Sequence, residues 1–117
     1  MEQLNKIILR GNVGNASFRT YDDRGYNRFS VATNFAYKSR DGQPNIDTLW
    51  MPVVAWEGRN ISAADLERVE KGTVVYVEGR LRLNKFVSTE GVERQQHEVV
   101  ANYLRIEDET AEIPYGY

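Results

Sequence analysis

The sequence contains no cysteine and only one histidine in 117 residues, and these shortages exclude several classes of protein. Without cysteine the chain forms no disulfide and no thiolate metal site. The single histidine, His97, is too few for a His-rich zinc site or for most histidine-based catalytic triads. No apolar run is long enough to span a membrane, and the first residues lack the basic-then-apolar pattern of a secretory signal. We therefore expect a cytoplasmic protein with no cofactor, no metal and no membrane partner.

The net charge of −2 is small, but it is unevenly distributed along the chain. Residues 1–106 carry a charge of +2, whereas residues 107–117 carry −4 and contain no basic side chain. A weakly acidic total charge therefore hides a mildly basic body, so a nucleic-acid partner is not excluded. We expect residues 1–106 to form one domain and residues 107–117 to form a short acidic tail, which has either a separate function or only a solubilising one.

Short strand-like runs separated by turn residues make up most of the chain. Extended segments are predicted at residues 6–13, 16–22, 28–37, 47–56, 74–86 and 93–106, with turns at 23–25, 39–45 and 88–91. Residues 60–70 alone show convincing helical spacing, with Asn60 or Ser62 as the N-cap and Gly72 beyond the end. Three strands, a helix and two strands are the order of the OB-fold, an all-β five-stranded Greek-key barrel, although other small barrels share such a pattern.

Alternation along residues 74–86 separates an apolar face from a polar one. The apolar face is predicted to point into the barrel and carries Val75, Val77, Gly79, Leu81 and Leu83. The outward face carries Glu78, Arg80, Arg82, Asn84 and Phe86. Arginine binds phosphate through forked hydrogen bonds, and phenylalanine offers a flat platform for a base. This face therefore suits nucleic acid, or it is a solvated face with one incidental aromatic residue.

The segment 47–56 has two largely apolar faces, and one of them carries both tryptophans. Trp50 and Trp56 share this face across Pro52, so it needs a cover if the other face is the core. A protein partner, a subunit interface or nucleobases would each cover it, and the alternative is that the tryptophans are core residues. Pro52 donates no ladder hydrogen bond, which predicts an edge strand or a bulge.

Tyr37 lies where a predicted strand meets a polar loop, and Lys38 and Arg40 follow it directly. An aromatic residue beside two cations suits stacking combined with neutralisation of a nucleic-acid backbone. The alternative is an edge tyrosine next to a solvated turn.

Four motifs in order resemble those of bacterial single-stranded DNA-binding proteins. They are NKIILRGNVG from residue 5, FSVAT from residue 29, TLW and VVAW from residues 48 and 53, and KGTVVYVEGRLR from residue 71. The resemblance extends over residues 4–106. It implies an OB-fold and sequence-independent binding of single-stranded DNA in replication, recombination and repair. It also implies a homotetramer, with a dimer left open.

The resemblance implies base stacking at four positions, namely Tyr37, Trp50, Trp56 and Phe86. Tyrosine and phenylalanine replace tryptophans that are common in the family at the first and last of these positions. For contacts to the DNA backbone we expect Lys6, Lys38, Arg40, Arg59, Arg80, Arg82 and Lys85.

The C-terminus departs from the family pattern. Relatives carry a long Gly/Pro/Gln-rich linker and an acidic tip that ends in Ile-Pro-Phe. Here Glu112, Ile113, Pro114 and Tyr115 resemble a variant of that tip without its linker. The resemblance implies that this tail recruits replication and repair proteins.

Two other functions compete with this interpretation. A primosome-type or RNA-binding OB-fold protein would share the same barrel. A nuclease would need clustered carboxylates for a metal, or a nucleophile beside its base. Asp22 and Asp23 lie at a turn and His97 lies in mid-strand, without supporting spacing, so we predict that the chain is not an enzyme.

Overall fold

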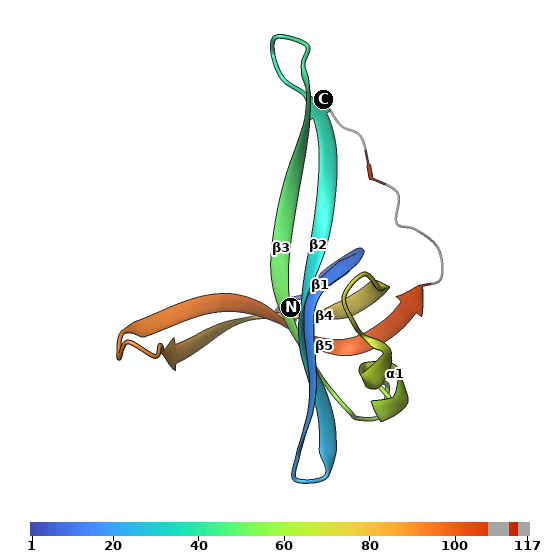
Figure 1. Ribbon diagram of the computed structural model, residues 1–117, viewed down its shortest axis with the longest axis vertical. Helices are drawn as coiled ribbons and strands as arrows, with labels where there is room; N and C mark the ends of the chain where they lie inside the picture. Colours follow the sequence, from blue (N-terminus) through green and yellow to red (C-terminus); the bar gives the residue numbers. More distant parts are fainter. Residues whose placement is uncertain (108–112, 115–117) are drawn as a thin grey trace.

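The chain folds into a closed barrel of five strands, with one short helix beside it (Figure 1). The computed structural model describes residues 1–107 and 113–114. The elements are β1 (Ile7–Tyr21), β2 (Arg24–Lys38), β3 (Pro44–Trp56), α1 (Ala63–Arg68), β4 (Val74–Val87) and β5 (Glu93–Glu107). The strand order around the barrel is β1-β2-β3-β5-β4, in which β3 and β5 pair in parallel. This arrangement, with the helix between β3 and β4, confirms the predicted OB-fold.

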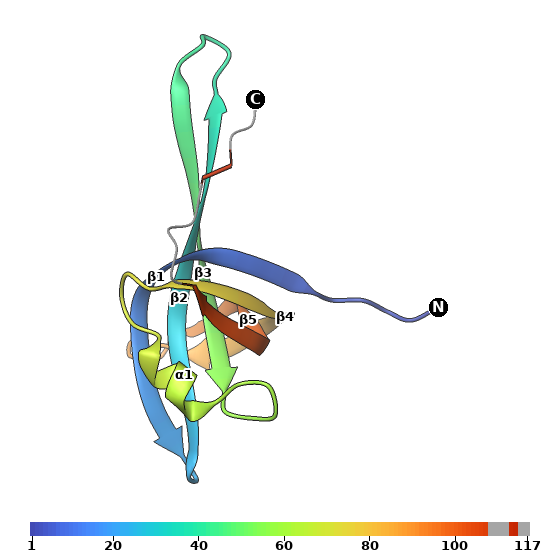
Figure 2. The same ribbon diagram turned by 90° about the vertical axis from the view of Figure 1, so that its right-hand side faces the viewer.

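The barrel interior is filled mainly by β-branched side chains, because alternate residues of each strand point inward. Val31 of β2, Val75 and Val77 of β4 and Val99 of β5 are completely buried there. Leu66 of α1 is also completely buried and belongs to the same apolar cluster. The helix therefore closes one end of the barrel, away from the tip of the β2–β3 hairpin (Figure 2).

The helix is shorter than the predicted 60–70 segment and is capped by Ser62, whose Oγ accepts a hydrogen bond from the Asp65 amide at 3.1 Å. It ends at Arg68 because the backbone of Val69 is extended. Asn27 holds this end to the barrel, since its Nδ2 donates to the Leu66 carbonyl at 2.8 Å. No helix among the described residues is long and apolar enough to cross a lipid bilayer.

The first hairpin differs from the prediction in its turn. The runs 6–13 and 16–22 form one strand with an irregularity between Val13 and Ala16. The turn consists of Asp22 and Asp23 instead of residues 23–25, and both aspartates have positive φ, 52° and 62°. A two-residue hairpin turn requires this left-handed backbone, which aspartate tolerates better than most residues do. Consequently β2 begins at Arg24.

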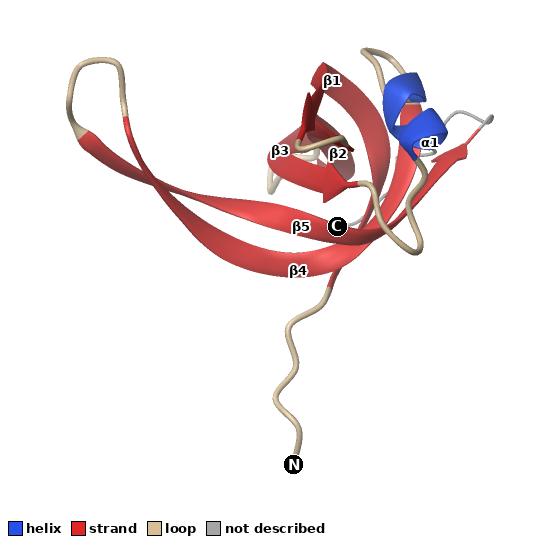
Figure 3. Ribbon diagram, turned by 90° about the horizontal axis from the view of Figure 1, so that it is seen from below, coloured by secondary structure: helices blue, strands red, loops and turns tan. Residues whose placement is uncertain are grey.

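Two hairpins extend beyond the barrel as two-stranded ribbons (Figures 1 and 3). We call residues 33–49 the β2–β3 arm and residues 82–98 the β4–β5 arm. Their pairing continues outward to Lys38–Pro44 and to Val87–Glu93. The prediction that Leu83 faces the barrel interior is wrong, because β4 has left the barrel at this point and Leu83 is 43% exposed.

Pro52 lies in β3 opposite Ser30 of β2. The parallel pairing of β3 with β5 begins only at the next residue, Val53. Up to Pro52, β3 is therefore an edge strand, which agrees with the position predicted for a proline.

Candidate nucleic-acid interface

Trp50 lies on the outer side of β3, where the β2–β3 arm leaves the barrel. Its side chain is 57% exposed. The ring packs against Gly14, where an added Cβ would lie 2.4 Å from the ring. Gly14 thus leaves room for the indole to rest on the sheet with much of its surface open to solvent. This exposure excludes, for Trp50, the alternative that the tryptophans are core residues.

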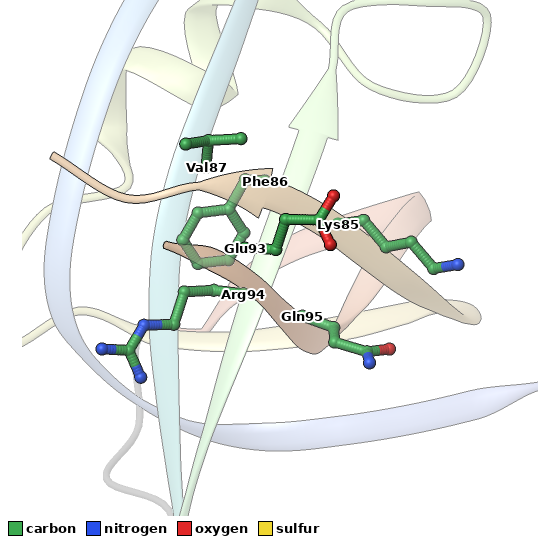
Figure 4. Close-up of a pocket in the computed structure, with 6 residues that line it drawn as sticks. All are labelled: Lys85, Phe86, Val87, Glu93, Arg94 and Gln95. Carbon is green, nitrogen blue, oxygen red and sulfur yellow. The ribbon is translucent and has the colours of Figure 1, made fainter. Parts of the chain in front are cut away.

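Phe86 lies near the end of the β4–β5 arm and is 42% exposed. It borders a hollow of about 370 Å³ between the two strands (Figure 4). Arg94 stands directly opposite Phe86 across the ribbon, and Figure 4 shows its guanidinium and the Lys85 ammonium reaching out in different directions. Arg94 was not among the predicted site residues. Counting outward from the predicted turn at 88–91 pairs Phe86 with Glu93 instead, because the loop between the strands is one residue longer, 88–92.

Tyr37 lies far out on the β2–β3 arm, opposite Asn45. Trp50 lies opposite Ala32 in the same ladder. Because successive strand residues point to opposite faces, Tyr37 and Trp50 belong to opposite faces of this ribbon. The structure therefore does not bring Tyr37 onto the face that carries Trp50.

Trp56 is half-buried at the end of β3 and contacts two residues that the sequence analysis missed. Its ring stacks on Tyr26 with the ring centroids 4.4 Å apart and the planes inclined by 25°. The guanidinium carbon of Arg24 lies 5.2 Å from the Trp56 ring centroid. The register of β2 with β3 places Tyr26 directly opposite Trp56. No short-range pattern in the sequence gives this pairing, because it depends on the length of the loop at 39–43.

Arg82 projects from the outer face of β4 and is ion-paired with Glu98 of β5. The Glu98 carboxylate also binds Arg28 of β2 at 3.2 Å, and its side chain is only 1% exposed. A buried carboxylate is stable only when it is paired, and here two guanidinium groups supply the pairing. This triad joins β2, β5 and β4, and it connects the Trp56 end of the outer face with the β4–β5 arm.

The remaining predicted cations divide into a paired and an unpaired group. The Lys6 ammonium lies 3.4 Å from the Glu78 carboxylate. Five of the predicted cations are exposed and have no carboxylate within ion-pair distance among the described residues: Lys38, Arg40, Arg59, Arg80 and Lys85. Three of these lie on the arms or at their ends.

The outer face of β1, β4 and β5 is different, because most of its charged side chains are ion-paired with one another. The Tyr76 ring lies between Arg10 and Arg105, at 5.0 and 4.7 Å. Both arginines are ion-paired with Glu107. The Tyr76 hydroxyl donates to Glu78 at 2.7 Å, and this hydrogen bond lowers the pKa of Glu78 and raises the pKa of Tyr76. This compensated face offers fewer free cations to phosphate than the arms do.

Of the tail beyond Glu107, the structure describes only Ile113 and Pro114, and Pro114 contacts the β2–β3 arm. The Pro114 carbonyl accepts a hydrogen bond from the Ala36 amide at 2.9 Å, and Ile113 is 46% exposed. Glu112 and Tyr115 lie outside the described residues.

Residues 4–107 match the single-strand binding protein family. The chain belongs to this family. It is 38% identical over 105 residues to a single-stranded DNA-binding protein of Xanthomonas axonopodis pv. citri, and 37% identical to one of Xanthomonas campestris pv. campestris. The matches cover 88% of this chain and 57% and 60% of those relatives. The chain therefore matches somewhat more than half of their length.

A solved complex of Plasmodium falciparum SSB with single-stranded DNA has a similar fold, with a TM-score of 0.76 and 26% sequence identity. The similarity covers 92% of this chain and 98% of that one. The shared architecture agrees with the barrel and arms described above.

Proposed function

We propose that this member of the single-strand binding protein family binds single-stranded DNA without sequence preference, in replication, recombination and repair, and does no chemistry on it. One observation supports this most strongly. Two aromatic rings are exposed: Trp50, where the β2–β3 arm leaves the barrel, and Phe86 on the β4–β5 arm. Lys85 and Arg94 lie beside Phe86 and form no ion pair among the described residues. Every unpaired base has a π-face, so stacking on these rings tolerates any sequence.

The proposed stacking set is Tyr37, Trp50, Trp56 and Phe86. Bases would stack on the exposed rings, at roughly 1–3 kcal/mol for each stacked base. Tyr37 lies on the other face of its ribbon, so its stacking requires the strand to pass around the β2–β3 arm. A strand that bends around the arms would reach both faces.

We expect the cations to differ in how much they contribute to phosphate binding. Lys38, Arg40, Arg59, Arg80 and Lys85 would contact phosphates first, because their charge is uncompensated among the described residues. Lys6 and Arg82 would contribute less, since each already pairs with a carboxylate.

The experiment is a fluorescence titration of the protein with oligo(dT) and with a DNA duplex of equal length. We expect tryptophan quenching and tight binding with oligo(dT) and much weaker binding with the duplex, because only unpaired bases expose their faces. Unchanged fluorescence and no binding at high oligo(dT) concentration would contradict the proposal. An oligo(U) of the same length in a parallel titration tests the alternative of an RNA-binding protein, which requires RNA to bind more tightly than DNA.

We further propose that the protein assembles with itself, as a homotetramer or as a dimer. The resemblance to the single-strand binding protein family supports this assembly, and the outer face of β1, β4 and β5 offers a sheet surface for it. Light scattering with and without oligo(dT) distinguishes the two assemblies, and a monomer in both conditions would contradict both.

The acidic tail is proposed to recruit replication or repair proteins through Glu112, Ile113, Pro114 and Tyr115. Its negative charge would also compete with DNA for the barrel's cations. Truncation after Glu107 keeps the ion pairs of Glu107 with Arg10 and Arg105. We expect the truncated chain to bind oligo(dT) more tightly at low salt, with a gain that shrinks as salt screens the competition. Equal affinity at low salt would show that the tail is a solubilising end.

A further inference from the structure

The Trp56 ring does not stand alone on the surface. Tyr26 covers part of the ring at a centroid distance of 4.4 Å, and Arg24 lies over it at 5.2 Å. Both residues lie on β2 with one residue between them, so they share its outer face with Trp56 across the ladder. This three-residue layer lies at the barrel end of the outer face, far from the arm tips.

Arg24 is anchored so that its charge stays at this position. Its Nε donates to the backbone carbonyl of Glu57 at 2.6 Å. The Glu57 carboxylate is engaged elsewhere, since its Oε1 accepts a hydrogen bond from the Gly25 amide at 3.0 Å. Among the described residues, no carboxylate forms an ion pair with Arg24. The two terminal guanidinium nitrogens of Arg24 are thus left for an anion.

A hollow of about 260 Å³ adjoins this layer. Arg24, Trp56, Arg59, Asn60 and Asn102 contribute to its lining. It therefore combines an aromatic wall, two cations and two amide side chains in one place. Forked guanidinium groups bind phosphate, and an aromatic face binds a base, so the chemistry of the lining matches one nucleotide of a single strand.

We propose that Arg24, Tyr26 and Trp56, together with Arg59, form one composite nucleotide site that extends the DNA path to the barrel end. Trp56 stacks on the base, and Arg24 and Arg59 bind the neighbouring phosphates. Tyr26 is a positioning residue that fixes the plane of the Trp56 ring before DNA arrives. This inference rests on the proposed binding of single-stranded DNA and adds Arg24 and Tyr26 to the residues that carry it.

The test uses a Trp50→Phe background, in which Trp56 is the only tryptophan and reports on its own site. We expect oligo(dT) to quench Trp56 in this background. Tyr26→Leu and Arg24→Gln should each raise the Kd by about fivefold or more and reduce the quenching amplitude. Tyr26→Phe should restore both values, because it keeps the ring that stacks on Trp56.

Matched controls lie away from this layer. Tyr103→Leu on β5 removes a tyrosine, and Lys71→Gln removes an exposed cation that follows α1. Neither residue lies opposite β2 or Trp56 in the sheet. Both controls should leave the Kd and the quenching amplitude unchanged. If Tyr26→Leu fails to fold, which circular dichroism would show, then Arg24→Gln and the Trp56 quenching decide the question.

The inference is overturned if Trp56 is not quenched, or if Tyr26→Leu and Arg24→Gln behave like their controls. A purely structural role of Tyr26 would lower the melting temperature without changing the quenching amplitude. Failure of the proposed function has a different signature, because the unmodified protein would then not bind oligo(dT) at all.

Discussion

The barrel and its two arms differ in how deeply they bury their apolar side chains, although the same strands build both. Inside the barrel, alternate residues of β4 such as Val75 and Val77 are completely buried. Further along the same face, Leu83 on the β4–β5 arm is 43% exposed. Side chains still alternate between the two faces of β4 on the arm, but no opposite barrel wall covers the apolar face there. A residue's burial in this fold therefore depends on where its strand leaves the barrel.

Polar side chains show the same contrast. Inside the barrel, the buried Asn27 side chain is fully paired: it hydrogen-bonds the Leu66 and Val69 carbonyls and the Ser17 amide. On the arms, Lys38 and Lys85 are exposed and have no carboxylate partner among the described residues. Exposed aromatic rings and unpaired cations do not stabilise the folded protein, but a single strand of DNA would bind to them. The barrel is the scaffold, and the arms carry most of the proposed binding surface.

The largest expected effect is on the scaffold. Leu66→Ala should lower the free energy of unfolding by about 2–5 kcal/mol, because it leaves a cavity where α1 closes the barrel. Urea denaturation measures this loss. Leu83→Ala is the matched control on the arm, and it should cost far less because Leu83 is already exposed. Equal losses would contradict the distinction between barrel and arm.

The next effect is on binding. Phe86→Ala should weaken oligo(dT) binding by roughly 1–3 kcal/mol while leaving the urea midpoint unchanged, because the ring lies outside the core. Phe86→Tyr keeps a π-face and should retain most of the affinity. If Phe86→Ala instead lowers the urea midpoint with no change in affinity, then Phe86 belongs to the scaffold.

A smaller effect is expected on the salt dependence of DNA binding, which should differ between unpaired and ion-paired cations. Lys85→Gln should reduce the slope of log K against log salt by about 0.7, the value for one phosphate contact with a single strand. Arg68→Gln, on the helix and paired with Asp65, should leave the slope unchanged. Arg82→Gln should have an intermediate effect, since Glu98 already compensates part of its charge. A full loss at Arg82 would show that DNA displaces Glu98.

The smallest effect concerns the compensated face. The hydrogen bond from Tyr76 lowers the pKa of Glu78 below its usual 4.5 in the folded protein. A lowered folded-state pKa adds stability above the unfolded pKa, and this stability is lost as pH falls through the folded value. When the pH falls from 7 to 3, the Tyr76→Phe variant should therefore lose less stability than the unmodified protein does. Urea midpoints at the two pH values measure this, and equal acid losses would contradict it.

The fold was largely predictable from the sequence because strands, turns and the helix are each indicated by residues close together in the chain. The strand runs, the polar turns and the helical segment all lie within short windows, and the resemblance of four motifs fixed their order. The turn at Asp22 and Asp23 was misplaced by one residue, since two adjacent aspartates and Arg24-Gly25 offer competing turn positions. The helix was overextended because the pattern continues after Arg68 although the backbone does not.

The candidate site was predictable only in part because its contacts are long-range. Phe86 was predicted on an outward face, since alternation within one strand identifies a face, and the structure leaves it 42% exposed. For Trp50 the same alternation left a core location open, because both faces of its strand are largely apolar. The neighbours of Trp56 and Arg82 were missed, since Tyr26 and Glu98 reach them across strands. Registers between strands depend on loop lengths and bulges, such as the shift between Glu78 and Gly79, which no local pattern reveals.

The most direct test combines both sides of the comparison in one protein, the Trp50→Ala, Phe86→Ala double variant. Its urea midpoint and its affinity for oligo(dT) should be measured on the same preparation. The account predicts a midpoint equal to that of the unmodified protein and a loss of affinity larger than that of either single variant. Retained affinity in the folded double variant, or unfolding of that variant, would contradict the claim that these exposed rings bind DNA and that the buried core only supports them.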